Sequence, residues 1–265
     1  MKAVQQDMTS GSPMKIILSF TLPIFIGNVF QQFYNMADAV IVGKFVGTGA
    51  LAAVGSTGTI MFLIYGFVVG MTAGFTVLTA QKFGAGDMEA MRKTVAGAAL
   101  LSLIIGIILT AAFMIFMEPW LVLMNTPEDI FKDAYSYIMI ISAGILAQML
   151  YNLLASILRA LGNSKVPLYF LILSAGLNIV LDLVLIIVFR MGTAGAAVAT
   201  VISQGVSGLL CLVYIVKAVP VLRMNRADWH PSGMLLKTQL RIGIPMALQY
   251  SITAIGTMMV QSALN

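Results

Sequence analysis

Residues 177–189 read LNIVLDLVLIIVF, an apolar run in which the only polar side chains are those of Asn178 and Asp182. With its flanks the run covers 166–189, and a helix needs about 20 such residues to cross a bilayer core roughly 30 Å thick. A carboxylate inside that core costs about 2.5 to 3.5 kcal/mol on insertion scales. The stretch therefore predicts a membrane-spanning helix that carries a functional acid.

The remainder of the 265-residue chain has the same character, since 60% of its residues are hydrophobic and 9% are charged. A soluble domain usually carries about 25% charged residues, so the composition excludes a water-soluble enzyme. One cysteine, Cys211, permits no internal disulfide, and one histidine, His230, argues against a zinc site. No nucleophile–base pair or phosphate-binding loop is present in the sequence, so we expect no enzymatic activity and no cofactor.

Seven stretches are long and apolar enough to span a membrane. They cover 15–40, 51–80, 94–117, 134–157, 166–189, 194–217 and 238–262. The sequence thus predicts an all-α membrane protein, a polytopic helix bundle.

Lysine and arginine fall mainly on one side of the predicted bundle. Twelve belong to the N-terminus and the second, fourth and sixth loops: Lys2, Lys15, Lys82, Arg92, Lys93, Arg159, Lys165, Lys217, Arg223, Arg226, Lys237 and Arg241. The opposite side has Lys44, Lys132 and Arg190. By the positive-inside rule the N-terminus is cytoplasmic. Membrane topology and anionic lipid account for the net charge of +5, so we expect lipid contact and no nucleic-acid partner.

The seventh span repeats features of the first. Lys15, Leu18 and Pro23 recur at a constant offset as Lys237, Leu240 and Pro245. Because six spans separate the copies, both begin on the same side, which is typical of a parallel repeat. We therefore expect a six-helix lobe at 1–217, a cytoplasmic linker at 218–237, and the first helix of a second lobe at 238–265. A chance match in leucine-rich helices is the alternative.

Two carboxylates lie inside predicted spans, Asp38 in the first and Asp182 in the fifth. No lysine or arginine nearby on the same helix face could neutralise either of them. Such a residue must be protonated, hold a cation or pair across helices, and is a functional candidate by default. Polar neighbours recur at helical spacing, namely Asn28, Gln31, Gln32 and Asn35 before Asp38, and Asn178 one turn before Asp182.

The helical rise of 1.5 Å per residue places Asp38, Asp182 and Thr200 all about 9 to 12 Å below the outer surface. A shared depth is what a single site needs. Together with the Asn178 amide oxygen they form an all-oxygen set, which suits Na⁺ or protons shared between the acids. Interhelical hydrogen bonding that only holds the bundle together is the alternative.

Further patterns indicate packing. Gly66, Gly70 and Gly74 form a ladder of small residues at four-residue spacing, which predicts close approach of another helix. Gln148 and Asn152 form a weaker polar face in the fourth span.

The sequence resembles the MATE family of multidrug and toxin extrusion transporters. The likeness is carried by TLPIFIGNVFQQFYNMADAVIVGKFVGTGALAAVG at 21–55, QKFGAGD at 81–87, RALGNSKVPLYFLILSAGLNIVLD at 159–182 and GTAGAAVATVISQ at 192–204. It runs through essentially the whole chain, and the combination and order of these motifs is more specific than any one of them.

The resemblance implies a twelve-helix transporter of two six-helix lobes, which exports bulky, often cationic organic compounds in exchange for Na⁺ or H⁺. The family's coupling site in the first lobe matches Asp38, Asn178, Asp182 and Thr200. Polar residues of the first and fourth helices border the drug cavity in such lobes, and they correspond to Gln31, Asn35 and Asn152. No cofactor and no metal other than Na⁺ at the coupling site is implied.

The resemblance also implies a bacterial cytoplasmic membrane, small organic substrates and a transporter that is monomeric at full length. Only the first lobe and one further helix are present, which favours a truncated chain. Two other readings stay open: a flippase for a lipid-linked oligosaccharide with the same two-lobe architecture, and a membrane scaffold whose polar stripes dock partner helices. A flippase cavity usually needs cationic residues to meet phosphate, and none lies within a predicted span.

Overall fold

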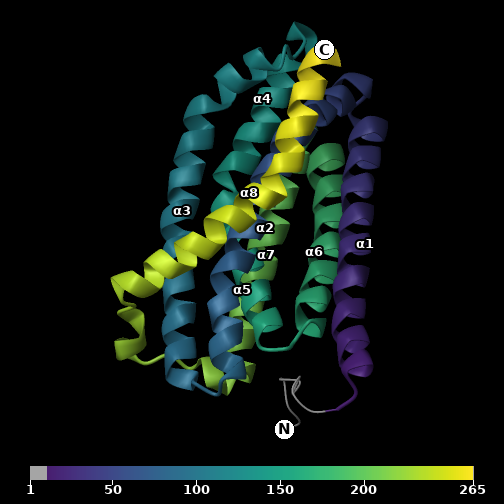
Figure 1. The fold of residues 1–265 in the computed structure, drawn as a ribbon. Coiled ribbons are helices and arrows are strands. Elements are labelled where there is room, and N and C mark those ends of the chain that lie inside the picture. The colour runs from purple at the N-terminus through teal and green to yellow at the C-terminus, as the bar shows by residue number, and fades with distance from the viewer. Residues whose placement is uncertain (1–10, 265) are drawn as a thin grey trace.

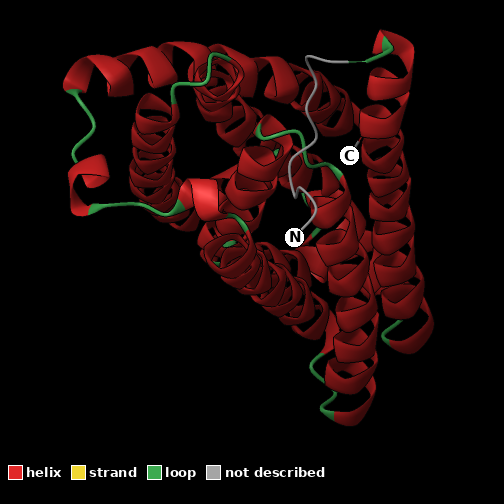
Figure 2. Ribbon diagram, turned by 90° about the horizontal axis from the view of Figure 1, so that it is seen from below, coloured by secondary structure: helices red, strands yellow, loops and turns green. Residues whose placement is uncertain are grey.

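We describe the protein from a computed structural model, in which residues 11–264 are described, except for the side chains of 253–255 and 257–264. In the described part every element is helix or loop (Figure 2). The α-helices are α1 (Pro13–Phe45), α2 (Thr48–Gly84), α3 (Met88–Leu123), α4 (Glu128–Ala143), α5 (Ile145–Ala160), α6 (Lys165–Leu183), α7 (Gly192–Ala218) and α8 (Gly233–Leu264). A π-helical turn, η1 (Val184–Val188), continues α6, and two 3₁₀ turns, η2 (Pro220–Leu222) and η3 (Arg226–Trp229), lie between α7 and α8.

The helices confirm an all-α membrane bundle. Five are long and apolar enough to cross a bilayer: α1, α2, α3, α6 with η1, and α7. The bent pair α4 and α5 makes a sixth when it is counted as one span. A helix satisfies its backbone hydrogen bonds internally, which the hydrocarbon core requires of any spanning segment. α8 is helical through the seventh predicted span, 238–262, but it is not among the described helices that are apolar enough to count as a span.

The fourth predicted span, 134–157, is not one continuous helix. α4 and α5 are bent by 48° at Gly144. The bend occurs where α7 presses on the glycine, because a side chain at Gly144 would overlap Val201. The broken geometry therefore follows from packing between helices, which no local pattern in the span reports.

The glycine ladder predicted on α2 is a contact with α8. A Cβ at Gly70 would lie 2.6 Å from the carbonyl oxygen of Met246, and one at Gly74 would lie 2.5 Å from Cα of Gly243. The two backbones touch, so α8 crosses the bundle diagonally in direct contact with α2 (Figure 1). The expectation of a close helix approach is confirmed, and its partner is the last helix of the chain.

The start of α8 is fixed to the other helices by polar contacts. Gln239 is fully buried, and its Nε2 donates to the carbonyl oxygens of Phe75 at 3.1 Å and Thr94 at 2.8 Å. In the linker, Arg92 at the start of α3 donates through Nε to Asp228 Oδ2 at 3.1 Å. The same carboxylate accepts from the backbone N–H of Asn225 at 2.8 Å. The segment predicted as a linker is thus held against α3, and the first turns of α8 are held against α2 and α3.

The basic helix ends gather at one end of the bundle, where α1, α3, α6 and α8 begin and α2, α5 and α7 end (Figure 1). Lys2, one of the residues used to orient the chain, lies outside the described residues, as does Asn265. The assignment of this end to the cytoplasm stays a prediction.

Replacing Asp228 with Asn is expected to release the linker from α3. An asparagine keeps an oxygen for the N–H of Asn225 but loses the charge that holds Arg92, and the pair is partly buried, with side chains 22% and 4% exposed. We expect a loss of about 1 to 2 kcal/mol in linker docking, seen as faster proteolytic cleavage between α7 and α8.

Glu89→Gln is the matched control, because it breaks an exposed ion pair with Lys93 on the same helix. Such pairs contribute about 0.5 kcal/mol or less. Equal cleavage rates for the two variants would contradict a docking role for Asp228.

Candidate functional site

The candidate site lies where α1, α6 and α7 meet. α1 packs mainly along α6, and α6 packs on α7 (Figure 1). Gly27 on α1 lies at this contact, where a Cβ would be in ordinary van der Waals contact with Leu168 and Leu171 of α6. Helices in lipid associate through such small-residue contacts and through interhelical hydrogen bonds. The three helices thereby bring together residues that are up to 166 positions apart in the chain.

Two pairs of polar residues, each spaced four positions apart, direct their side chains into this contact. Tyr34 and Asp38 are one turn apart on α1, and both are 7% exposed. Asn178 and Asp182 are one turn apart on α6, and both are fully buried. Because residues i and i+4 share a helix face, each pair points in one direction. The structure therefore buries the acids of both helices.

Thr200 of α7 is the hydrogen-bonding centre of the cluster. Its Oγ1 accepts from the hydroxyl of Tyr34 at 3.1 Å and from Nδ2 of Asn178 at 3.4 Å. A threonine hydroxyl has two acceptor sites and one proton to donate, so its proton remains available. One side chain thus links α1, α6 and α7.

The two carboxylates adjoin this centre and act on one another electrostatically. Four of the cluster's buried oxygen atoms receive no hydrogen bond from a donor in the described part of the chain: Asp38 Oδ1, both Oδ atoms of Asp182 and Asn178 Oδ1. The two carboxyl groups lie within hydrogen-bonding range of one another, so a proton between them would join them. The ion pairs among residues 11–264 join Lys82 to Asp87, Arg92 to Asp228 and Lys93 to Glu89, so no basic side chain neutralises Asp38 or Asp182.

An unpaired buried acceptor is costly, and two adjacent carboxylates are more so. What this group lacks is a donor or a positive charge. Carboxylate, amide and hydroxyl oxygens are the ligands that hard cations take, and a proton shared between two acids satisfies the same deficit. The residues present therefore fit either Na⁺ or H⁺ by their chemistry.

Backbone geometry next to Asp182 is irregular. The α-helix changes to the π-helical turn η1 at Val184, a feature that the predicted span 166–189 did not anticipate. Gly195 on α7 packs against Leu185 and Ile186 of this turn, where a Cβ would be within 3.3 to 3.4 Å of them. π turns inside α-helices occur frequently at functional sites.

Two tyrosines that the sequence analysis did not identify belong to the site. Tyr34 donates the hydrogen bond to Thr200, and Tyr137 of α4, which is 2% exposed, lies within electrostatic range of Asp38, Asp182 and Tyr34. For Tyr34 the sequence held a signal, because it precedes Asp38 by one helical turn. For Tyr137 no local signal existed.

The residues expected to border a drug cavity differ in how far they are buried. Gln31 is half-buried and Asn35 is exposed, both on α1. Asn152 is buried on α5, where its Nδ2 donates to the carbonyl oxygen of Gln148 at 2.8 Å. α1 packs on α6, α2 and α7, and α5 packs on α2, α7, α3 and α6, so the two helices have three neighbours in common. Their role in a cavity stays a prediction.

Comparison with protein-family models gives a match to MatE over residues 23–184. This interval contains α1 from its internal proline, α2 to α6 and the start of η1, and thus Asp38, Asn178 and Asp182.

Curated relatives cover nearly all of this chain. The probable multidrug resistance protein YpnP of Bacillus subtilis is 36% identical over 262 residues, which are 98% of this chain and 58% of the relative. The multidrug export protein MepA of Staphylococcus aureus is 24% identical over 94% of this chain and 55% of the relative. The chain therefore spans little more than half the length of these relatives.

Solved structures agree. An outward-facing multidrug resistance MATE family transporter of the MOP superfamily superposes with a TM-score of 0.85 at 29% identity, over 94% of this chain and 55% of that one.

Proposed function

Since the chain belongs to the MatE family, we propose that it forms the ion-coupled lobe of a secondary multidrug antiporter. It is not proposed to be an enzyme, and it needs no cofactor. The observation that carries this proposal is the buried group of unpaired acceptor oxygens on Asp38, Asn178 and Asp182. A bundle in lipid retains such a group at a cost, so it is expected to have a functional ligand.

In the proposed cycle Na⁺ or H⁺ enters from outside and binds at Asp38 and Asp182. The positive charge removes the repulsion between the two carboxylates and lets α1 move closer to α6 and α7. When the ion leaves toward the cytoplasm, the repulsion returns and the helices separate. Two packings that differ in affinity for the ion are what coupling to transport requires.

The proposed cargo is a small organic compound, often cationic. The names of the relatives, multidrug resistance and multidrug export proteins, support this substrate class. Gln31, Asn35 and Asn152 are proposed to border its cavity. Because Gln31 and Asn35 are not fully covered by the described helices, they are free to face a second lobe across a cleft.

The proposed organisation is a first lobe at 1–217, a linker at 218–237 and, from 238, the first helix of a second lobe. The matched relatives are longer than this chain, which supports the division. The proposed location is the bacterial cytoplasmic membrane, with the N-terminus in the cytoplasm and a monomeric transporter at full length.

The test is counterflow in proteoliposomes that contain the full-length protein carrying this sequence, a fluorescent organic cation and an imposed Na⁺ or pH gradient. We expect gradient-driven movement of the dye, and its loss when Asp38 and Asp182 are both replaced by Asn. Movement that survives the double replacement would place coupling outside this lobe. Absence of movement in the parent protein would overturn the antiporter and favour the flippase or scaffold.

A further inference from the structure

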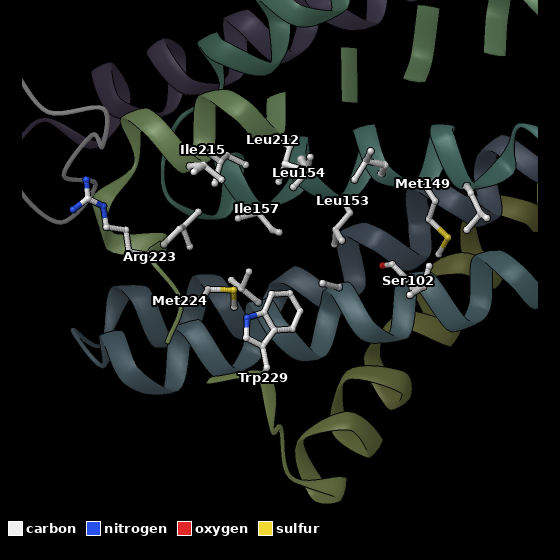
Figure 3. A pocket seen from close by; sticks show the side chains of 17 residues that line it. Ser102, Met149, Leu153, Leu154, Ile157, Leu212, Ile215, Arg223, Met224 and Trp229 are labelled. Atoms are coloured by element: carbon white, nitrogen blue, oxygen red, sulfur yellow. The ribbon is translucent and has the colours of Figure 1, made fainter. Parts of the chain in front are cut away.

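An apolar groove lies outside the candidate site, between α3 on one side and α5 and α7 on the other. Its volume is about 660 Å³. The polar lining residues are Ser102 at one end and Arg223 at the other, and the walls between them are aliphatic side chains and methionine (Figure 3). The groove does not include Asp38, Asp182 or Thr200.

The groove opens toward the bilayer. Its rims are Leu103 on α3, which is 53% exposed, and Val216 on α7, which is 64% exposed. Further exposed aliphatic residues continue both rims, including Ile107 and Ile108 on α3 and Leu209 and Val213 on α7. Because both helices are membrane spans, the medium in contact with this opening is lipid hydrocarbon.

The length of the groove matches one leaflet. Its α5 wall runs from Leu146 to Ile157, about 16 Å along the helix at 1.5 Å per residue. Half of a hydrocarbon core is about 15 Å deep. An acyl chain that enters at the C-terminal end of α7, from the leaflet on that side, therefore has room along the whole α5 wall.

The linker closes that end with side chains suited to a membrane interface. Leu222 and Met224 continue the apolar lining, and the indole of Trp229 reaches into the groove (Figure 3). Tryptophan is enriched at the level of lipid headgroups. Arg223 stands at the end of the groove, and its guanidinium extends away from the apolar walls.

Arg223 is exposed, and no acidic side chain among residues 11–264 forms an ion pair with it. Asp228, the nearby acid of the linker, is already held by Arg92. An apolar channel one leaflet deep thus ends at an uncompensated positive charge. This polarity matches an amphiphile with one long apolar chain and an anionic head.

We infer that the groove binds one acyl chain of an anionic phospholipid, with the lipid phosphate at Arg223. The bound lipid joins α3, α5 and α7 to the linker, because all four contribute to the groove. The site is independent of the proposed transport activity, so it can be tested without transport.

The chain supplies its own reporter. The 265 residues include two tryptophans. Trp120 does not line the groove and packs edge-to-face on Phe113. In a Trp120→Phe background of the full-length protein, the part of the quenching that a further Trp229→Phe replacement removes reports on Trp229, whatever other tryptophans that protein carries. Phospholipids with dibrominated acyl chains quench a tryptophan that they contact, so quenching by dibrominated phosphatidylglycerol and phosphatidylcholine gives their relative affinities.

We expect phosphatidylglycerol to bind about fivefold more tightly than phosphatidylcholine, because one arginine near an anionic headgroup contributes about that factor. Arg223→Gln should reduce the ratio of the affinities for phosphatidylglycerol and phosphatidylcholine to about one. Arg226→Gln, which removes an exposed linker arginine that does not line the groove, should leave it unchanged. Ala99→Phe, which fills the groove wall, should reduce quenching by both lipids.

Equal affinities in the parent chain would overturn the inference. So would a loss of selectivity in Arg226→Gln as large as that in Arg223→Gln, because the preference would then reflect general surface charge. Both arginines are exposed, so neither variant depends on refolding of the bundle.

Discussion

Asp182→Asn is expected to abolish gradient-driven export while making the lobe more stable. Both Oδ atoms of Asp182 are buried and receive no hydrogen bond from a donor group, and their neighbour is a second buried carboxyl group, that of Asp38. Removing a charged ligand should weaken cation binding about 100-fold, which corresponds to about 3 kcal/mol for a charge-assisted contact. The same change removes a desolvated acid, and we expect the free energy of unfolding to rise by about 1 kcal/mol.

Counterflow measures the first effect and thermal unfolding in detergent the second. Glu118→Gln is the control, since it neutralises an exposed carboxylate on α3 and should change neither quantity. A lower unfolding temperature for Asp182→Asn would contradict this account, because it would mean that the carboxylate stabilises the fold. Retained coupling would contradict the proposed ion site.

Gly74→Ala is expected to detach α8 from α2. The added Cβ would lie 2.5 Å from Cα of Gly243 and 3.0 Å from its nitrogen, and a backbone cannot rotate aside as a side chain can. Overpacking costs typically 1 to 3 kcal/mol, and a backbone contact places this variant at about 3 kcal/mol. We expect a lower unfolding temperature and a linker that proteases cleave readily.

The same helix supplies a control at Gly58, where a Cβ would meet nothing within 4 Å. Gly58→Ala should be neutral or stabilise by up to about 1 kcal/mol, because alanine is the better helix former. If Gly58→Ala and Gly74→Ala destabilise equally, helix flexibility rather than the α2–α8 contact would explain the result.

The helical bundle could be predicted from the sequence, because a membrane-spanning helix is recognised by the length and apolarity of its own segment alone. The shared depth of Asp38, Asp182 and Thr200 could be predicted too, since the fixed rise of a helix converts sequence distance into depth. The structure brings these three to one place, and their hydrogen-bonding centre is Thr200. Their role in coupling stays a prediction.

Other features depend on neighbours that the sequence does not reveal. At Gly144, where α4 and α5 are bent relative to one another, Val201 of α7 occupies the space that a side chain would need. Tyr137 joins the site through the packing of α4, and an amphipathic tyrosine in an apolar run resembles ordinary core. The polar stripe of α1 is only partly covered, with Asn28, Gln32 and Asn35 exposed and Asp38 buried.

The backbone contact between α2 and α8 has a consequence for the proposed two-lobed protein, because it fixes part of α8 to the described helices. Gly66, Gly70 and Gly74 contact α8 from Gly243 to Tyr250, and Gln239 fixes its first turns. The first half of α8 is therefore part of the rigid body of the first lobe. If a second lobe moves relative to the first in the proposed transporter, we therefore expect the bending to occur in α8 beyond Tyr250 and not in the linker, which is held by Arg92. In that arrangement the first half of α8 would stay fixed to the first lobe, and its second half would move with the second lobe.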